Sequence, residues 1–325
     1  MAELIDACGR RIDYLRLSVT DRCDLRCTYC MPPEFDDYEP PAHWLSFDEL
    51  ERVARIFVTL GVSRIRLTGG EPLLRARINE LARRLKGNAG LRDLSLSTNG
   101  TQLARHAARL RAAGVDRLNV SLDTLARERF VQITRRDALS DVLAGLESAR
   151  AAGFALTKIN MVWLPAINGD EVDAMIDYCR AHGFVLRLIE NMPMGRTARQ
   201  VGASDLQPLI ARLRRDHGLV DHAIPGGGPA RYLTSPDRGF SIGFITPLSQ
   251  HFCDTCNRVR VTVDGELHLC LGAEHRIDLL HMMRTGHSDA DIAAAIRTAL
   301  HHKPRQHELR EAPEKIVRFM SSTGG

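Results

Sequence analysis

Three cysteines within eight residues constrain this chain more than any other feature. A strand-like run ends in a polar loop whose thiols have C-x3-C-x2-C spacing: Cys23, Cys27 and Cys30. A structural zinc site takes four ligands, so three thiols alone do not complete one. A fully ligated [4Fe–4S] cube takes four cysteines, so three would leave one iron open to a small molecule. The spacing predicts such an open cluster, and the alternative is a zinc site whose fourth ligand comes from elsewhere.

The bulk composition is that of an ordinary globular protein. The 325 residues are 44% hydrophobic and 26% charged, enough for one large α/β domain and a smaller appendage. A formal net charge of +4 is too small to indicate a nucleic-acid partner. No apolar run approaches the roughly 18 residues of a membrane span, and the N-terminus lacks a signal-peptide pattern. We therefore expect a cytoplasmic protein, in which eight cysteines indicate metal binding or catalysis before disulfides.

Helical and strand-like segments alternate from residue 46 onward. Ser46 to Glu49 reads as a capping box, and glycines close the predicted helices near 46–60, 75–86, 101–113, 138–152 and 170–182. Strands are predicted at 62–68, 92–97, 116–121, 155–162 and 184–190, which makes six with the first. Such alternation predicts a parallel sheet whose ligands bind at the C-terminal ends of the strands. The periodicity alone leaves open whether the sheet is doubly wound or a partial barrel.

The pattern changes after about residue 195. A helix near 204–216 is followed by a glycine-rich joint at 226–229 and by strand-like runs at 239–246 and 258–271, the second bent at Asp264-Gly265. A further helix is predicted near 288–302. We expect a first domain at residues 1–195 and a smaller C-terminal α+β module at residues 196–325.

The C-terminal module carries a second set of three thiols. Cys253, Cys256 and Cys270 have C-x2-C-x13-C spacing, again one short of four. We interpret them as a second open cluster. A zinc ribbon completed by His251 or His268 is the alternative. The remaining cysteines, Cys8 and Cys179, are assigned to ordinary packing.

These motifs resemble a known family. The run Cys23-Asp-Leu-Arg-Cys27-Thr-Tyr-Cys30 is similar to the signature of radical S-adenosylmethionine (SAM) enzymes, which have a partial (β/α)6 barrel. The two triplets together resemble the GTP 3′,8-cyclase family, also called molybdenum cofactor biosynthesis protein A. The linking segments that share this likeness are 67–72, 97–100, 119–123, 257–260 and the terminal Gly324-Gly325. The likeness covers nearly the whole chain and is weakest over 196–250.

The resemblance implies a lyase that uses two [4Fe–4S] clusters and SAM. It would convert GTP to (8S)-3′,8-cyclo-7,8-dihydroguanosine 5′-triphosphate, the first step of molybdenum cofactor (molybdopterin) biosynthesis. One electron from the first cluster would split SAM and yield a 5′-deoxyadenosyl radical that abstracts the ribose 3′ hydrogen. The resemblance also implies an electron donor such as flavodoxin or ferredoxin, a downstream cyclic pyranopterin monophosphate synthase and a homodimer, with no nucleic-acid or membrane partner.

The resemblance assigns a role to individual residues. The metal ligands would be Cys23, Cys27 and Cys30 for the first cluster and Cys253, Cys256 and Cys270 for the second. The SAM-binding residues would be Tyr29, Gly70, Ser121 and Met192. The GTP-binding residues would be Arg16, Arg66, Ser97, Lys158, Arg258, Val259 and Arg260, and the catalytic group would be the first triplet with Arg258 and Arg260. Convergent cations suit a triphosphate, and an anion would offset the cost of burying Lys158 in its apolar stretch.

Two other functions remain open from the sequence. The first is a different two-cluster radical SAM enzyme, such as a peptide-modifying maturase, which would not need this set of cations or the terminal glycines. The second is a zinc-stabilised nucleic-acid-binding module, which would need a basic patch that a charge of +4 hardly provides. The glycine tail fits a segment that threads into the active site, although its composition alone favours a disordered end.

Overall fold

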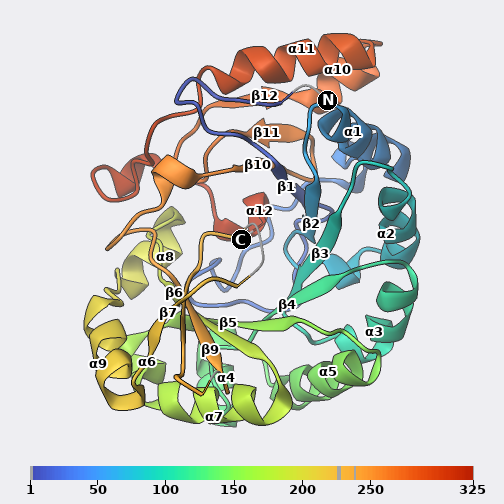
Figure 1. Ribbon diagram of the computed structural model, residues 1–325. Helices are drawn as coiled ribbons and strands as arrows, with labels where there is room; N and C mark the ends of the chain where they lie inside the picture. Colours follow the sequence, from blue (N-terminus) through green and yellow to red (C-terminus); the bar gives the residue numbers. More distant parts are fainter. Residues whose placement is uncertain (1–2, 225–227, 238, 325) are drawn as a thin grey trace.

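A computed structural model describes residues 3–224, 228–237 and 239–324. Within these residues, twelve strands form one sheet in the order β12-β11-β10-β1-β2-β3-β4-β5-β6-β9-β8-β7. All neighbours from β10 to β9 are parallel, whereas the strands outside them pair antiparallel. The sheet curls into an open barrel with helices around its outer face (Figure 1). The partial barrel implied by the resemblance is confirmed.

The first six strands lie close to the predicted ranges. They are β1 (Tyr14–Ser18), β2 (Arg64–Thr68), β3 (Asp93–Thr98), β4 (Arg117–Ser121), β5 (Thr157–Trp163) and β6 (Val185–Glu190). The predicted helices are α1 (Phe47–Thr59), α2 (Ile78–Lys86), α3 (Leu103–Ala112), α5 (Leu139–Ala151) and α7 (Val172–His182). The capping box at Ser46 and Glu49 is present at the start of α1. The prediction omitted α4 (Arg127–Thr134), α6 (Pro165–Asn168) and α8 (Gly195–Val201), which are too short for a clear periodic signal.

Alternation along each strand separates a core from a polar interior. Leu15 and Leu17 of β1 are fully buried in the core, and the intervening Arg16 lines a cavity inside the barrel. The same pattern recurs in β2, where Ile65 packs in the core and Arg66 lines that cavity. Successive side chains of a strand point to opposite faces, so apolar residues meet the helices and polar residues meet the interior.

The C-terminal segment supplies strands to both ends of the parallel sheet. Its strands are β7 (Val220–His222), β8 (Arg231–Thr234), β9 (Ser241–Ile245), β10 (Arg258–Val261), β11 (Glu266–His268) and β12 (Arg276–Asp278). β9 pairs parallel with β6, and β10 pairs parallel with β1. The predicted turn at Gly265, with φ 85°, joins β10 to β11. The segment is α+β as expected, but its strands extend the barrel sheet.

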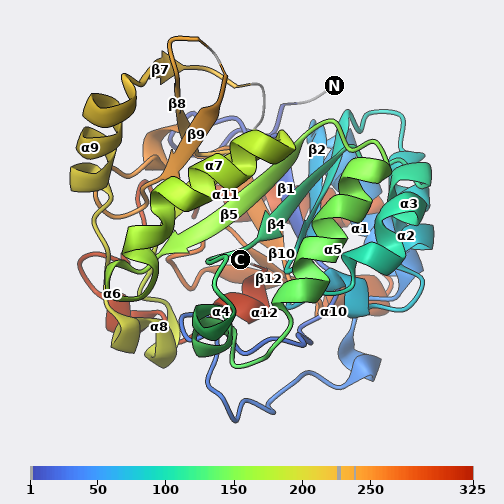
Figure 2. The same cartoon turned by 90° about the horizontal axis from the view of Figure 1, so that it is seen from below.

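The helices of the C-terminal segment occupy different positions. They are α9 (Gln207–His217), α10 (Leu279–Arg284), α11 (Asp289–Leu300) and α12 (Met320–Thr323). Short 3-10 helices complete the elements: η1 (Pro41–His43), η2 (Pro72–Leu74), η3 (Gly169–Glu171), η4 (Cys253–Thr255) and η5 (Pro313–Lys315). Two views agree that α12 lies inside the barrel (Figures 1 and 2). Residues 226–227 of the predicted glycine-rich joint and the last glycine lie outside the described residues. In the described part of the chain, no helix is long and apolar enough to cross a membrane.

Candidate active site

The loop after β1 places the first three cysteines on one cavity. Cys23, Cys27 and Cys30 line a space of about 200 Å³ at the C-terminal ends of the strands. The residues predicted to bind SAM line the same cavity: Tyr29, Gly70, Ser121 and Met192. The structure therefore brings together residues that are up to 169 positions apart, from Cys23 to Met192 (192 − 23).

The chemistry of these thiols fits an iron–sulfur cluster. Burial raises the pKa of Cys23 to about 12 and that of Cys30 to about 11, and it raises the pKa of Cys27 well above its usual range. Each thiol is therefore protonated at neutral pH unless a bound cation stabilises the thiolate, as iron does. Among the described residues, no three His, Cys, Asp or Glu side chains converge on a single metal ion. A cube binds its thiolates on separate irons and does not need such convergence.

A buried carboxylate holds the loops that surround this cavity. Glu71 follows β2, is 0% exposed, and accepts hydrogen bonds from the Leu73 N–H (2.9 Å), the Thr98 hydroxyl (2.8 Å) and the Asn99 N–H (2.6 Å). Burial raises the pKa of Glu71 to about 7. The Asn99 amide in turn donates to Asp24 at 2.7 Å, directly after the first cysteine. Glu71 thus links the loops that follow β1, β2 and β3.

The two glycines after β2 are required for backbone packing. A Cβ at Gly69 would lie 2.3 Å from the Thr20 carbonyl oxygen, and one at Gly70 would lie 2.2 Å from the Arg22 carbonyl oxygen. The Gly70 N–H donates to Thr20 O at 2.8 Å. Because a ligand amine donates its hydrogen bonds, at Gly70 it would be bound by the carbonyl oxygen. From the sequence we expected these glycines to clear space for a ligand. That interpretation did not include their close backbone contact with the loop that carries the first three cysteines.

Tyr29 lies between two of the cysteines and is fixed from β4. Its hydroxyl donates to Asp123 Oδ2 at 2.7 Å, and the Val162 N–H donates to the other oxygen of the same carboxylate at 2.8 Å. Burial raises the pKa of Asp123 to about 6. Asp123 therefore orients the Tyr29 ring at the wall of the cavity.

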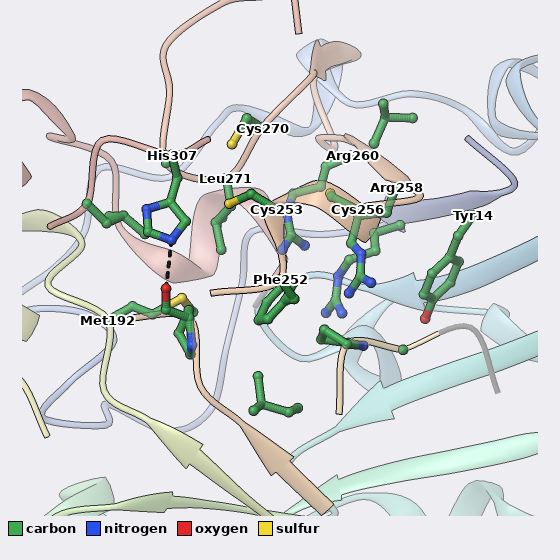
Figure 3. Close-up of a pocket in the computed structure, with 18 of the residues that line it drawn as sticks. Tyr14, Met192, Phe252, Cys253, Cys256, Arg258, Arg260, Cys270, Leu271 and His307 are labelled. Atoms are coloured by element: carbon green, nitrogen blue, oxygen red, sulfur yellow. Dashed lines mark hydrogen bonds between the residues drawn. The ribbon is translucent and has the colours of Figure 1, made fainter. Parts of the chain in front are cut away.

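The second triplet lines an adjoining cavity of about 160 Å³. Cys253, Cys256 and Cys270 lie along one side, and Arg258 and Arg260 extend from β10 toward it (Figure 3). The predicted GTP-binding residues that line this cavity are Arg16, Arg66, Ser97, Arg258, Val259 and Arg260. The cavity shares wall residues with the first one: Ser97, Asn160, Ile189, Met192 and Met320.

Three arginines form a row across neighbouring strands. Arg66 of β2 pairs in register with Arg16 of β1, and Arg16 pairs with Arg260 of β10. Burial and the neighbouring guanidiniums lower the pKa of Arg16 well below its usual value, and burial and Arg258 lower that of Arg260 to about 10. Both arginines donate to the Gly324 carbonyl oxygen at 3.1 Å. The described part of the C-terminal tail therefore reaches the arginine row, and Gly325 lies outside the described residues.

Lys158 lies in a third, smaller cavity of about 30 Å³ next to this row. Arg66 and Arg187 line both this cavity and that of the second triplet. The ammonium donates to the Tyr232 hydroxyl at 2.8 Å. Burial, followed by the charge of Arg187, lowers the pKa of Lys158 to about 7. An anion placed here would favour the charged lysine.

The sequence interpretation missed Arg187. This residue of β6 is buried, and it donates to Asn160 Oδ1 at 2.8 Å and to Asn119 Oδ1. The sequence pattern that indicated Arg16 is also present at Arg187, which is a charged residue between apolar neighbours in a predicted strand. It adds another cation to the wall that the two cavities share.

The remaining cysteines and the candidate zinc ligands lie elsewhere. Neither His251 nor His268 lines the cavity of the second triplet, and His268 instead contacts Arg318 and Glu266. Cys179 is packed in the core as expected. Cys8 is exposed in a turn, so its assignment to packing is wrong; the turn is set by the Asp6 carboxylate, which accepts from the Cys8 N–H.

Comparison with known proteins identifies the class. A family model described as the radical SAM superfamily matches residues 17–179, and one described as Molybdenum Cofactor Synthesis C matches residues 184–309. The solved structure of SuiB from Streptococcus suis bound to S-adenosylmethionine has a similar fold, with a TM-score of 0.55 at 14% identity over 88% of this chain and 68% of that chain.

Curated relatives narrow the class to one family. GTP 3′,8-cyclase 1 of Pseudomonas aeruginosa is 47% identical over 100% of both chains. GTP 3′,8-cyclase of Erythrobacter litoralis is 46% identical over 100% of this chain and 99% of its own. The chain therefore belongs to the GTP 3′,8-cyclase family of radical SAM enzymes.

Proposed function

We propose that this chain cyclises GTP to (8S)-3′,8-cyclo-7,8-dihydroguanosine 5′-triphosphate at the start of molybdenum cofactor biosynthesis. The observation that carries the proposal is the adjoining pair of thiol-lined cavities with a row of arginines beside them. One molecule can contact both cavities because Ser97 and Met192 belong to the walls of both. A nucleotide with a charged end and a planar base suits this arrangement.

The first cavity would hold the radical source. Cys23, Cys27 and Cys30 would bind a [4Fe–4S] cluster that, together with SAM, supplies a carbon radical. Gly70 would accept a hydrogen bond from the SAM amine through its carbonyl oxygen, and Ser121 would contact the ribose or carboxylate end. Tyr29 and Met192 would pack against the adenine. The chain thus positions SAM and shields it from water.

The cations of the interior would hold the triphosphate. We assign this role to Arg16, Arg66, Ser97, Lys158, Arg258, Val259 and Arg260, and we add Arg187. Guanidiniums bind phosphate oxygens through two parallel N–H groups, so a row of them fixes both position and orientation. Burial, followed by mutual repulsion, lowers the pKa values of Arg16 and Arg260, and a bound anion would offset both effects. Because the Gly324 carbonyl oxygen occupies two of these arginines, triphosphate and tail would share them.

The second triplet would bind a second [4Fe–4S] cluster with an open iron for the guanine. In this proposal residues 1–195 carry the SAM cluster and residues 196–325 the substrate cluster. We further propose a cytoplasmic location, because thiols that hold such clusters persist in a reducing compartment. The proposed partners are an electron donor such as flavodoxin or ferredoxin, a downstream cyclic pyranopterin monophosphate synthase and a second copy of this chain.

Anaerobic turnover tests the proposal. The chain is reconstituted with iron and sulfide, and 5′-deoxyadenosine is measured with SAM and dithionite, with and without GTP. We expect about eight irons per chain and deoxyadenosine that accumulates with GTP. ATP serves as the matched control, because it offers the same triphosphate with a different base. Deoxyadenosine formed equally without GTP, or bound zinc in place of iron, would overturn the assignment.

A further inference from the structure

Lys303 has no role in the function proposed above, yet it is buried beside the second triplet. It follows α11, is 3% exposed and lines the cavity that holds Cys253, Cys256 and Cys270. The chain has only four lysines against forty arginines, so a lysine at a buried position needs a physical explanation.

The ammonium of Lys303 is held by backbone carbonyls. Its Nζ donates to Arg258 O at 3.1 Å and to Leu269 O. Within residues 3–224, 228–237 and 239–324, no carboxylate forms an ion pair with it. Burying an ammonium without an anionic partner costs free energy. Some negative charge near Lys303 is therefore required to offset this cost.

A second buried cation in the same region gives a contrast. Arg10 donates to the Cys253 carbonyl oxygen at 2.9 Å, so it also contacts the backbone of the second triplet. However, its guanidinium is paired with Asp6 at 2.6 Å. The charge of Arg10 is thus balanced by a carboxylate, whereas in the part of the chain that the structure describes no carboxylate balances that of Lys303.

The positions of the two carbonyls indicate what balances Lys303. Leu269 directly precedes Cys270, and Arg258 lies two residues after Cys256. One ammonium therefore joins the two segments that present these thiols from different parts of the chain. An ammonium has three N–H groups, and two are used, so one remains for a group in the cavity.

We propose that Lys303 is a positioning residue for the second cluster. The net negative charge of the thiolate-ligated cluster would balance the ammonium, and the two carbonyl contacts of Lys303 would maintain the spacing of the segments that carry the ligands. This inference rests on the second cluster of the proposed function. A buried positive charge near a cluster favours the reduced form, which carries more negative charge, so Lys303 should raise the reduction potential of that cluster.

The test compares two variants with one control in anaerobically reconstituted full-length protein. K303M keeps the length of the side chain and removes the charge. K303Q removes the charge and keeps an N–H donor. K86M is the matched control, because Lys86 is paired with Asp116 at 2.6 Å on the surface. Iron content during exposure to a chelator and the midpoint potential of each cluster are measured, the latter by EPR-monitored titration.

We expect K303M to lose iron from the second cluster about 10- to 100-fold faster than wild type, as second-sphere substitutions commonly do. The second midpoint potential should become more negative in K303M and K303Q, the first cluster should be unchanged, and K86M should match wild type. The metal-free K303M protein should unfold at the same or higher denaturant concentration than metal-free wild type, because an unpaired buried charge has been removed.

The inference would be overturned if K303M kept the midpoint potential of the second cluster and its iron at wild-type levels. It would also be overturned if metal-free K303M unfolded at a lower denaturant concentration than metal-free wild type and both clusters were lost, because Lys303 would then have a purely structural role. Failure of the proposed function is distinguishable from either result. In that case wild type itself would hold about four irons or fewer, before any variant is compared.

Discussion

At the scale of single residues, the interior of this barrel is defined by buried charges that repel one another. Arg16 and Arg66 lie on the neighbouring strands β1 and β2, and Lys158 and Arg187 lie on the neighbouring strands β5 and β6. Burial lowers the pKa of Lys158 to about 7 and that of Arg187 to about 10. These cations destabilise one another until an anion binds among them. The burial and repulsion that lower their pKa values therefore favour the binding of an anion such as a triphosphate.

We predict that the affinity for GTP falls as the pH rises from about 7 to 9. Lys158 in the free protein loses its proton over this range, because its pKa of about 7 lies below the usual 10.5. Only the protonated form attracts the triphosphate, so the dissociation constant should rise by at most about tenfold per pH unit. Calorimetric titration with GTP at several pH values measures this effect. In K158M the same titrations should show little pH dependence, and an equally steep dependence in K158M would contradict the assignment.

At the scale of structural elements, the loops that follow β1, β2 and β3 form one hydrogen-bonded unit. Glu71 accepts from the Leu73 and Asn99 N–H groups, and the Asn99 side chain reaches Asp24 in the cysteine loop. Gly69 and Gly70 bring these loops into direct backbone contact. The first cavity is thus arranged by its surrounding loops before any ligand is bound.

We predict that E71Q weakens both folding and SAM binding. A glutamine has one acceptor oxygen, so its amide group must face the N–H of either Leu73 or Asn99 and leave that donor unpaired. An unpaired buried donor costs about 1–3 kcal/mol in free energy of unfolding. Denaturant unfolding and equilibrium SAM binding measure the two effects. E80Q is the control, because Glu80 is a surface residue of α2 paired with Arg77, and it should change stability by less than about 0.5 kcal/mol.

At the scale of the whole molecule, the C-terminal tail connects distant parts of the barrel. Arg318 donates to the carbonyls of Leu271 and Ala273 near the second triplet. α12 then lies inside the barrel, and Gly324 contacts Arg16 and Arg260. The described part of the tail therefore passes both thiol cavities and reaches the arginine row at Gly324.

We predict that G324A slows turnover without loss of clusters. Gly324 has φ 69°, and a Cβ there would lie 2.3 Å from Thr68 Cγ2, so the tail must shift away from the arginines. Misplacement of about 1 Å at a reaction site costs up to about 100-fold in rate. Turnover and iron content of the reconstituted protein are measured together. T68S/G324A should recover part of the rate because the serine lacks the clashing methyl group, and T68S alone serves as the control. Full activity of G324A would show that the tail contact is not used.

Much of the barrel and of the site follows from local sequence. The six strands and their helices were predicted within a few residues, because strand alternation and helix caps are local signals. The cysteine spacing predicted which thiols share a cavity, and the charged residue between Leu15 and Leu17 predicted an inward arginine. α4 was missed because it has only eight residues and no side-chain cap at Ala126.

The long-range arrangement did not follow from these local patterns. That β9 pairs with β6, and β10 with β1, depends on which strand edges remain unpaired once the barrel has formed. The meeting of Lys303 with Arg258 and Leu269 depends on the same pairing, since β10 carries Arg258.

The sequence by itself determined the barrel repeat and both cysteine triplets, because these depend on spacing within a segment, and its resemblance to a known family indicated most of the interior cations. Only the tertiary structure decided that the two triplets face adjoining cavities, that Arg187 and Lys303 line the cavity of the second triplet, and that Gly324 contacts Arg16 and Arg260. The physical reason is that edge pairing and charge burial are properties of the assembled sheet, and residues far apart in the chain meet only after it has folded.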